Sequence, residues 1–391
     1  MISHCTSKQS KLTLTEYDSI GDISPLWDAF LPENHSLKSG NLEVLELAKL
    51  DDMVFKYLLV QNKNILKGVV YLQHLRIRNA HFDGTSIDKP GLGWLKKIVN
   101  NQFSDVLICG NLFRIHFPGF YFSEDTDASL VFELLMEYLN SNKGHSKFCG
   151  IILKDCLSKL NNTGKFRSYH DDVTMELELR ENWYSLEDYK ASLDKKYRQR
   201  FQKIRNSKAK VDSKELSFEA IKTQADCITR LYQNVALKQA LRIGFVNANY
   251  FAQMKRRHGD NFVFKAYYLN GEMLAFSSHI FYPDKSMEIH YIGLDYNFNE
   301  THCLYFNILY DGVELGIKNR VNRLELGRTA RVAKASVGAQ PVEVHNYLYL
   351  KSGIPCLAFS FFNTWFVKNL GEEWKERNPF KKVALPDDVV Q

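Results

Sequence analysis

A carboxylate and an imidazole stand two positions apart in the run MEIHYIGLD (residues 287–295), a spacing that can support proton transfer. Apolar and polar residues alternate here, with Met287 and Ile289 beside Glu288 and His290, so the run predicts a β-strand. The two polar side chains then point to the same side of the strand, about 7 Å apart. A carboxylate among apolar residues is expected to be paired or to titrate unusually, as functional groups do. We therefore predict Glu288 and His290 as general bases; the structural alternative is an edge-facing Glu and a hydrogen-bonded core His.

A second group of charged residues surrounds the end of the apolar run RLEL at 323–326. Arg328 follows this predicted strand, and its planar guanidinium suits a carboxylate or a phosphate of a substrate. Glu325 could orient that guanidinium or hold an incoming amine, and we count it among the catalytic candidates. Lys334 adds a second cation for substrate binding. The structural alternatives are a Glu325–Arg328 ion pair and a solvated helix lysine.

Two further residues are expected to line the same site, namely His279 and Tyr291 in neighbouring predicted strands. The nearby Ser277 and Ser278 lack the Ser-His-Asp arrangement that would support a nucleophile. The seven cysteines include no CxxC pair, and their odd number argues against a zinc cluster or a closed set of disulfides. We predict no metal site.

Basic residues dominate the segment 194–210, DKKYRQRFQKIRNSKAK. Tyr197, Phe201 and Ile204 recur at helical spacing, so the segment predicts a helix that packs one apolar stripe and leaves its cations around the remainder. The residues predicted to contact a polyanion or an acyl donor are Lys195, Lys196, Arg198, Arg200, Lys203 and Arg205.

The elements that would position these residues follow in a defined order. Those expected in the second half are a strand at 173–179, the basic helix, helices at 224–241 and 247–257, strands at 262–269, 273–282 and 287–295, a helix at 301–318, a strand at 323–326, a short helix from about 329 and a strand at 342–350. Asn270-Gly271 predicts a hairpin, because both central positions of a type I′ turn need positive φ.

The first half repeats part of this order in weaker form. Its expected elements are a helix at 25–30, strands at 53–60, 66–77 and 105–109, a helix at 126–140 and a strand at 148–153. The order of hairpin, strand, helix and strand indicates a degenerate duplicate of the second half, although no sequence repeat is visible.

Two segments resemble the FemAB-like proteins of the GNAT superfamily. One is the strand, spacer and basic helix ELELRENWYSLEDYKASLDKKYRQRFQKIRNSKAKV. The other is RLELGRTARVAKASVGAQPV, which resembles the stretch in which an apolar strand ends in Gly-Arg-Ser or Gly-Arg-Thr and then reaches a Lys and a Gly-Ala-x-Pro turn. The matching positions are Gly327, Arg328, Thr329, Lys334, Gly338, Ala339 and Pro341.

The resemblance implies an α/β (α+β) fold with two GNAT-like domains, each a mixed, mostly antiparallel sheet flanked by helices. We expect a degenerate GNAT-like domain at 1–170, a GNAT-type acyltransferase domain at 171–352 and a C-terminal helical segment at 353–391. The family further implies transfer of an acyl or aminoacyl group, from a thioester or an aminoacyl-tRNA, onto an amine acceptor.

Acyl-CoA is one donor that this resemblance allows, but the loop that would bind its pyrophosphate is not evident. CoA-dependent GNAT enzymes usually place a Gln/Arg-x-x-Gly-x-Gly/Ala loop before a helix, whose backbone amides cradle the pyrophosphate. This chain has YNFNETHCLY there, without glycine and with Glu300 nearby. The sequence therefore predicts weak CoA binding, and with it another donor or a site that has decayed.

Length and composition agree with two globular domains. The 391 residues exceed what one core usually serves, and the 45% hydrophobic and 25% charged fractions are ordinary. The N-terminal run MISHCTSKQSKLTLTEY has no apolar segment, and the longest uncharged apolar run, 354–367, is shorter than the roughly 20 residues of a spanning helix. We therefore expect a cytoplasmic protein without a transmembrane segment.

Two functions without catalysis stay open, and the net charge of +6 does not decide between them. The basic helix at 194–210 could bind RNA or phosphates, with tRNA as one partner. Alternatively, an inactive scaffold could touch a membrane surface through the aromatic residues of 354–367, although packing against the first domain explains the same residues.

Overall fold

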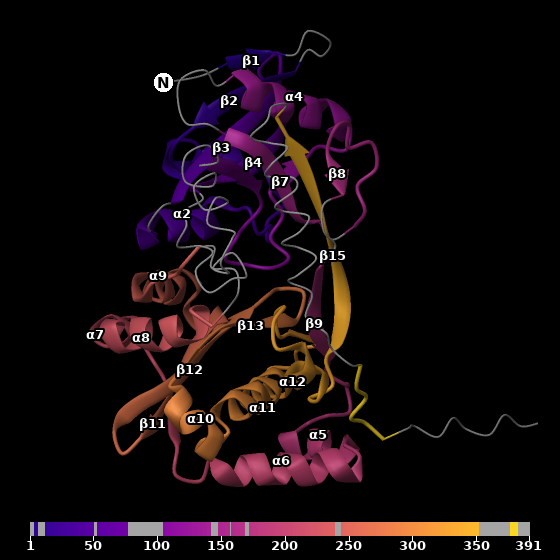
Figure 1. The fold of residues 1–391 in the computed structure, drawn as a ribbon. Helices are drawn as coiled ribbons and strands as arrows, with labels where there is room; N and C mark the ends of the chain where they lie inside the picture. Colours follow the sequence, from indigo (N-terminus) through magenta and orange to yellow (C-terminus); the bar gives the residue numbers. More distant parts are fainter. Residues whose placement is uncertain are drawn as a thin grey trace, which may run out of the picture. The chain divides into compact units, whose positions relative to one another are not determined.

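The structure, a computed structural model, describes residues 4–6, 12–50, 53–76, 105–141, 148–156, 158–168, 172–238, 244–351 and 376–381. By its internal contacts the chain divides into two compact units. Unit 1 consists of Met1–Asp172, Ala236–Arg257 and Glu343–Gly371, and unit 2 of Val173–Val235, His258–Val342 and Glu372–Gln391. Each unit combines helices with a mostly antiparallel sheet, which is the predicted α/β (α+β) class (Figure 1).

The sheet of unit 1 has the strand order β1-β2-β3-β4-β5-β7-β15. Only β5 and β7 run parallel among these neighbours. The strands are β1 (His4–Thr6), β2 (Leu12–Tyr17), β3 (Met53–Asn62), β4 (Ile65–Arg76), β5 (Asp105–Cys109), β6 (Phe120–Phe122), β7 (Phe148–Cys156), β8 (Arg167–Ser168) and β15 (Gln340–Leu350), which begins in unit 2. The helices are η1 (Ile20–Asp22), α1 (Ser24–Phe30), α2 (Ser39–Ala48), α4 (Ala128–Ser141) and α9 (Ala248–His258).

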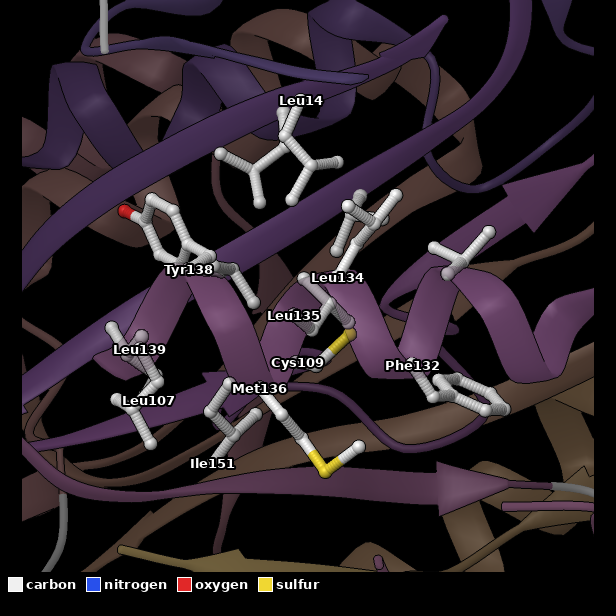
Figure 2. Close-up of a cluster of buried hydrophobic side chains, with 14 of the residues drawn as sticks. Leu14, Leu107, Cys109, Phe132, Leu134, Leu135, Met136, Tyr138, Leu139 and Ile151 are labelled. Atoms are coloured by element: carbon white, nitrogen blue, oxygen red, sulfur yellow. The ribbon is translucent and has the colours of Figure 1, made fainter. Parts of the chain in front are cut away.

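Helix α4 supplies much of the core of unit 1. Its apolar residues recur every three or four positions, so one face of the helix carries Val131, Leu135 and Leu139. This face packs on apolar side chains of the sheet, among them Leu107 and Ile151 (Figure 2). The crossover helix thereby holds the parallel pair β5 and β7 in place.

The sheet of unit 2 has the order β9-β14-β13-β12-β11-β10, and only β13 and β14 run parallel. The strands are β9 (Asp172–Glu178), β10 (Asp212–Glu215), β11 (Phe262–Leu269), β12 (Glu272–Phe281), β13 (Ser286–Leu294) and β14 (Arg323–Glu325). The helices are α5 (Leu186–Ser192), α6 (Lys195–Ser207), α7 (Phe218–Thr223), α8 (Ala225–Ala236), η4 (Gly259–Asn261), α10 (Tyr296–His302), α11 (Leu304–Lys318) and α12 (Arg331–Ala335).

Helix α11 packs against one face of the unit 2 sheet, where Met287, Ile289 and Leu324 are buried. Gly312 brings the helix close to the sheet, since a Cβ there would lie 2.5 Å from the side chain of Ile289. The other face of the same strands carries the alternate residues, which include Glu288. The sheet therefore separates an apolar side from a side with charged residues.

The two sheets have the same topology. In each, a hairpin (β3–β4 or β11–β12) is followed by an antiparallel strand (β5 or β13), a crossover helix (α4 or α11) and a parallel strand (β7 or β14). The two sheets thus share the order and direction of these strands, and a duplication remains a prediction.

Several predicted elements are confirmed, including the hairpin at Asn270 and Gly271, whose φ values are 51° and 85°. The prediction of a single helix at 301–318 is wrong. Cys303 adopts a left-handed φ of 45° and separates α10 from α11. Helix α9, expected in the second domain, belongs to unit 1 by its contacts.

The predicted C-terminal segment at 353–391 lies outside the described residues, apart from 376–381. There Phe380 pairs with Leu193 and packs against Trp183 and Tyr189 within unit 2. Over the described ranges, every helix is too short or too polar to span a bilayer.

Candidate active site

The parallel strands β13 and β14 pair over three residues and then separate. Ser286 pairs with Arg323 and Glu288 with Glu325, where β14 ends. Strand β13 continues to Leu294 without β14 as a neighbour. The two predicted strands therefore lie side by side, and their pairing opens at their carboxyl ends as expected.

Three buried glutamates share one rung of the sheet at this point. Glu325 pairs with Glu288 on one side and with Glu176 of β9 on the other, so the three side chains point to the same face. Neighbouring strands are about 4.8 Å apart. The residues are only 3% (Glu288), 6% (Glu325) and 6% (Glu176) exposed. The rung, here called the glutamate row, brings three carboxyl groups together where strand pairing ends.

Glu288 is held through both carboxylate oxygens. The hydroxyl of Tyr282 donates to Oε2 at 2.6 Å, and Nδ1 of His290 contacts Oε1 at 2.6 Å. The side chain of His290 is 1% exposed. The predicted pair is thus a hydrogen-bonded dyad, and Tyr282 is a partner that the sequence analysis missed.

The other two glutamates have partners of their own. Thr174 of β9 donates its hydroxyl to Glu325 at 2.9 Å, and Nε of Arg323 lies 3.7 Å from Glu176. Neither Thr174 nor Glu176 was a sequence candidate. Only the register of β9 against β14 brings them to the row, so no local pattern could have identified them.

A β-bulge in β13 directs the residues after Glu288. His290 and Tyr291 both stand opposite Ser278, because the register with β12 shifts between Ser277 and His279. The hydroxyl of Ser278 accepts from the Tyr291 amide at 3.0 Å and donates to its carbonyl oxygen at 3.3 Å. Such bulges re-aim side chains next to active sites. The ring of Tyr291 lies against that of His290, with 4.4 Å between centroids.

The predicted cations lie just beyond the end of β14. Gly327 has a φ of 82°, and a Cβ at this position would be 3.4 Å from Nζ of Lys334. Lys334 is only 4% exposed, which excludes the solvated helix lysine of the alternative interpretation. Arg328 is half-buried, and its carbonyl accepts a hydrogen bond from Arg331.

His279 lies on the opposite face from the glutamate row. It pairs with Ile289, whose side chain meets α11, and its Nε2 is 2.9 Å from the Ser277 hydroxyl. Burial, with a contribution from the charge of Lys265, lowers the pKa of His279 to about 3. The structure therefore does not bring His279 to Glu288, in contrast to the sequence prediction.

The basic helix α6 divides its cations between two surroundings. Lys195, Lys196, Arg200 and Lys203 are exposed, and Arg198 is half-buried. Arg205 turns inward to Asp311 of α11, with 2.6 Å between Nη1 and Oδ1. Arg205 is thus an internal ion-pair partner, unlike the other predicted polyanion contacts.

The segment YNFNETHCLY, expected as a loop, forms α10 and the start of α11. The side chain of Asp295 caps α10 by accepting from the Asn297 amide at 3.0 Å. A carboxylate at this helix end opposes the binding of a phosphate. Over the residues that the structure describes, no three His, Cys, Asp or Glu side chains are grouped to hold a metal ion.

Comparisons with known proteins found similarity in solved structures. No family model matches the sequence, and no curated protein matches it significantly. The chain is similar to FemX (11% identity, TM-score 0.47, covering 86% of this chain and 97% of FemX). It is also similar to a tandem GNAT protein from the clavulanic acid biosynthesis pathway (9% identity, TM-score 0.46, covering 88% of this chain and 99% of that protein). A third similar structure is L-PGS from Bacillus licheniformis (12% identity, TM-score 0.44, covering 85% of this chain and 93% of L-PGS). Similarities at this level assign neither an activity nor a substrate to this chain.

Proposed function

We propose that unit 2 is an N-acyltransferase that moves an acyl or aminoacyl group from a thioester or an aminoacyl-tRNA to an amine. One observation carries the proposal: the Glu288–His290 dyad lies where β13 leaves β14, in the same sheet rung as two more buried carboxylates. The resemblance of the segments 323–342 and 176–211 to FemAB-like proteins supports the same chemistry.

Proton transfer can be assigned within the dyad. A carboxylate only accepts hydrogen bonds, so the contact with Glu288 places the proton of His290 on Nδ1 and the lone pair on Nε2. Nε2 then takes a proton from the acceptor ammonium, while Glu288 stabilises the imidazolium as the Asp does in a Ser-His-Asp triad. His290 is the base in this scheme, and Glu288 orients it.

Amide formation follows deprotonation of the acceptor amine. The neutral amine nitrogen bonds to the donor carbonyl carbon, and the carbon–sulfur or carbon–oxygen bond of the donor breaks. The second proton of the attacking nitrogen passes to the leaving thiolate or alkoxide, and the imidazolium of His290 returns its proton to solvent. The glutamate row favours an acceptor that arrives as a cation, and Lys334 and Arg328 supply positive charge for a carboxylate or phosphate of a substrate.

The test is a transfer assay with labelled donors. Aminoacyl-tRNAs, acyl-CoAs and acyl carrier protein thioesters are incubated with the full chain and a panel of amines, and amide products are measured by mass spectrometry. We expect His290→Gln and Glu288→Gln to lower the rate by about 100-fold or more, the range for loss of a general base.

Glu272→Gln is the matched control, because Glu272 is an exposed glutamate at the start of β12 outside the site. It should transfer at the wild-type rate. Unchanged transfer by both dyad variants would remove the basis of the proposed mechanism.

A non-catalytic alternative rests on the exposed cations of α6. Lys195, Lys196, Arg200 and Lys203 would contact the phosphates of RNA, and affinity would then fall steeply with salt. A salt titration of tRNA binding by the wild type and by a variant with Lys195, Lys196 and Lys203 changed to Gln separates this function from transfer. Loss of tRNA binding with unchanged transfer from thioesters would assign α6 to RNA alone.

A further inference from the structure

The shared topology of the two sheets identifies a counterpart of the active-site position within unit 1. Among the strands described in that sheet, the parallel pair is β5 and β7, and its pairing ends at Cys109 and Leu153. Pairing between the two strands then stops. Gly110, just after β5, has a φ of 140°, and Asp155, in a β-bulge of β7 opposite Asn346 of β15, has a φ of 55°. Asp155 comes two residues after the last paired residue, as Gly327 does after Glu325 in unit 2, where φ is also positive.

Polar side chains are buried where the pairing of β5 with β7 stops. Asn111 is 1% exposed, Asp155 2% and Arg114 5%. Burying such groups is costly without partners, so a cluster of them away from the apolar core indicates a functional position. Unusual φ values are also concentrated at such sites.

The cluster is held by several contacts within unit 1. Nζ of Lys154 contacts the carboxylate of Asp155 and lies 3.5 Å from the carbonyl oxygen of Arg114. Asn346 accepts from the Asp155 amide at 3.0 Å. The guanidinium of Arg114 lies over the ring of Phe117, 5.0 Å from its centroid. These contacts fix the cationic groups at the carboxyl ends of the two strands.

Charge distinguishes this cluster from its counterpart. The position in unit 2 combines three glutamates with Arg328 and Lys334, whereas the charged residues described at the position in unit 1 are Arg114, Lys154 and the single carboxylate of Asp155. Crevices at the carboxyl ends of parallel strands are common ligand sites, and a buried arginine suits planar anions. We infer that unit 1 carries a second ligand site at the ends of β5 and β7, centred on Arg114 and Lys154, which takes a carboxylate or phosphate group.

Binding of simple anions to the full chain tests this inference. Inorganic phosphate, pyrophosphate and acetate are titrated calorimetrically, with chloride at equal ionic strength as the reference, and hydrogen exchange of residues 105–117 and 148–156 locates the site. We expect saturable binding of at least one anion with slower exchange in these segments. The phosphate and acetate arms decide which group the site prefers.

Arg114→Lys should weaken binding at least tenfold, because lysine keeps the charge but not the planar fork. Arg180→Lys is the matched control, since Arg180 of unit 2 also stacks over an aromatic ring, 5.2 Å from the centroid of Trp183. The anion affinity of this variant should match that of the wild type. Lys154→Gln provides a second variant, expected to bind weakly, if Arg114→Lys does not fold. The inference would be overturned if phosphate, pyrophosphate and acetate all bound no better than chloride. It would also be overturned if Arg114→Lys and Lys154→Gln both bound the anion with wild-type affinity. The experiment measures anion binding and not acyl transfer, so a failure of this inference is distinguishable from a failure of the proposed reaction.

Discussion

Single residues at the end of β14 determine where the cations of the candidate site lie. Gly327 combines a positive φ with close approach to Lys334, and these two properties have separate effects. Any L-residue at such a φ is strained, whereas only a Cβ at 327 would also lie in van der Waals contact with the buried ammonium. The role of Lys334 can therefore be isolated with two alanine variants.

Gly327→Ala should lose about 1–2 kcal/mol of unfolding free energy from backbone strain. It should also weaken transfer, because the new methyl group would lie against Nζ of Lys334, where we propose that a carboxylate or phosphate of a substrate binds. Gly271→Ala is the control, since Gly271 has a φ of 85° and a Cβ there would meet no atom within 4 Å, so this variant should lose stability without losing transfer. Urea denaturation and the transfer assay measure the two effects. Equal transfer by both variants would exclude Lys334 from the site.

At the scale of elements, one buried carboxylate fastens α6 to α11 and β11. Asp311 of α11 contacts Arg205 and Lys208 at 2.6 and 2.7 Å and Lys265 of β11 at 3.0 Å. Tyr267 donates its hydroxyl to the same carboxylate at 2.9 Å. Burial acts to raise the pKa of Asp311, but the three cations outweigh it and hold the pKa below the usual range.

Asp311→Asn should lose about 3–5 kcal/mol, because it leaves partly buried cations without their carboxylate. The folded-state pKa is lowered, so the stabilisation by wild-type Asp311 is complete above the unfolded value of 3.8 and declines as pH falls below it. The stability difference between wild type and variant in urea should therefore be constant near neutral pH and narrow below about pH 4. Glu314→Gln, which changes an exposed partner of Arg205, should cost under about 1 kcal/mol. A small loss in Asp311→Asn would show that α6 is held by its apolar stripe alone.

Helix α10 bears on the choice of donor. Its first turn is capped by Asp295, and its sequence has no glycine to let a pyrophosphate approach the backbone amides. We expect CoA to bind weakly, with a dissociation constant well above the micromolar range, and Asp295→Ser to improve binding by removing the negative charge while keeping a cap. Calorimetry with CoA checks both statements. Micromolar affinity in the wild type would contradict them.

At the scale of the whole molecule, the two units are interleaved along the chain. Helix α9 comes between elements of unit 2 in sequence but belongs to unit 1. Its residues Asn247 and Asn249 donate to backbone carbonyls of Ala48 and Leu47, and the ring of Tyr250 packs near Phe113. A cut at the predicted domain boundary, between residues 170 and 171, would therefore separate α9 from Leu47, Ala48 and Phe113.

A fragment spanning residues 171–352 should consequently be less stable than the full chain and expose apolar surface. Tyr250, Phe251 and Met254 of α9 are at most 1% exposed in the structure, and burial of each such side chain contributes about 1.5–3 kcal/mol. Fluorescence of a dye that binds apolar surfaces, together with light scattering, should reveal exposure and association. A monodisperse fragment with the unfolding midpoint of the full chain would contradict this prediction.

The sequence by itself determined most elements of regular structure. Strand alternation located β13 and its Glu288–His290 dyad, helical spacing located α6, and Asn270-Gly271 located the hairpin. These features depend on residues near one another in the chain, so local patterns carry them.

Tertiary structure decided which side chains meet. Glu176 reaches the glutamate row only through the register of β9. His279 faces α11 because it pairs with Ile289 and therefore shares the face of Ile289 and not that of Glu288. Arg205 turns inward because Asp311, far along the chain, lies beneath it. Pairing register and packing between distant segments depend on the whole sheet and its helices, so no local pattern specifies them.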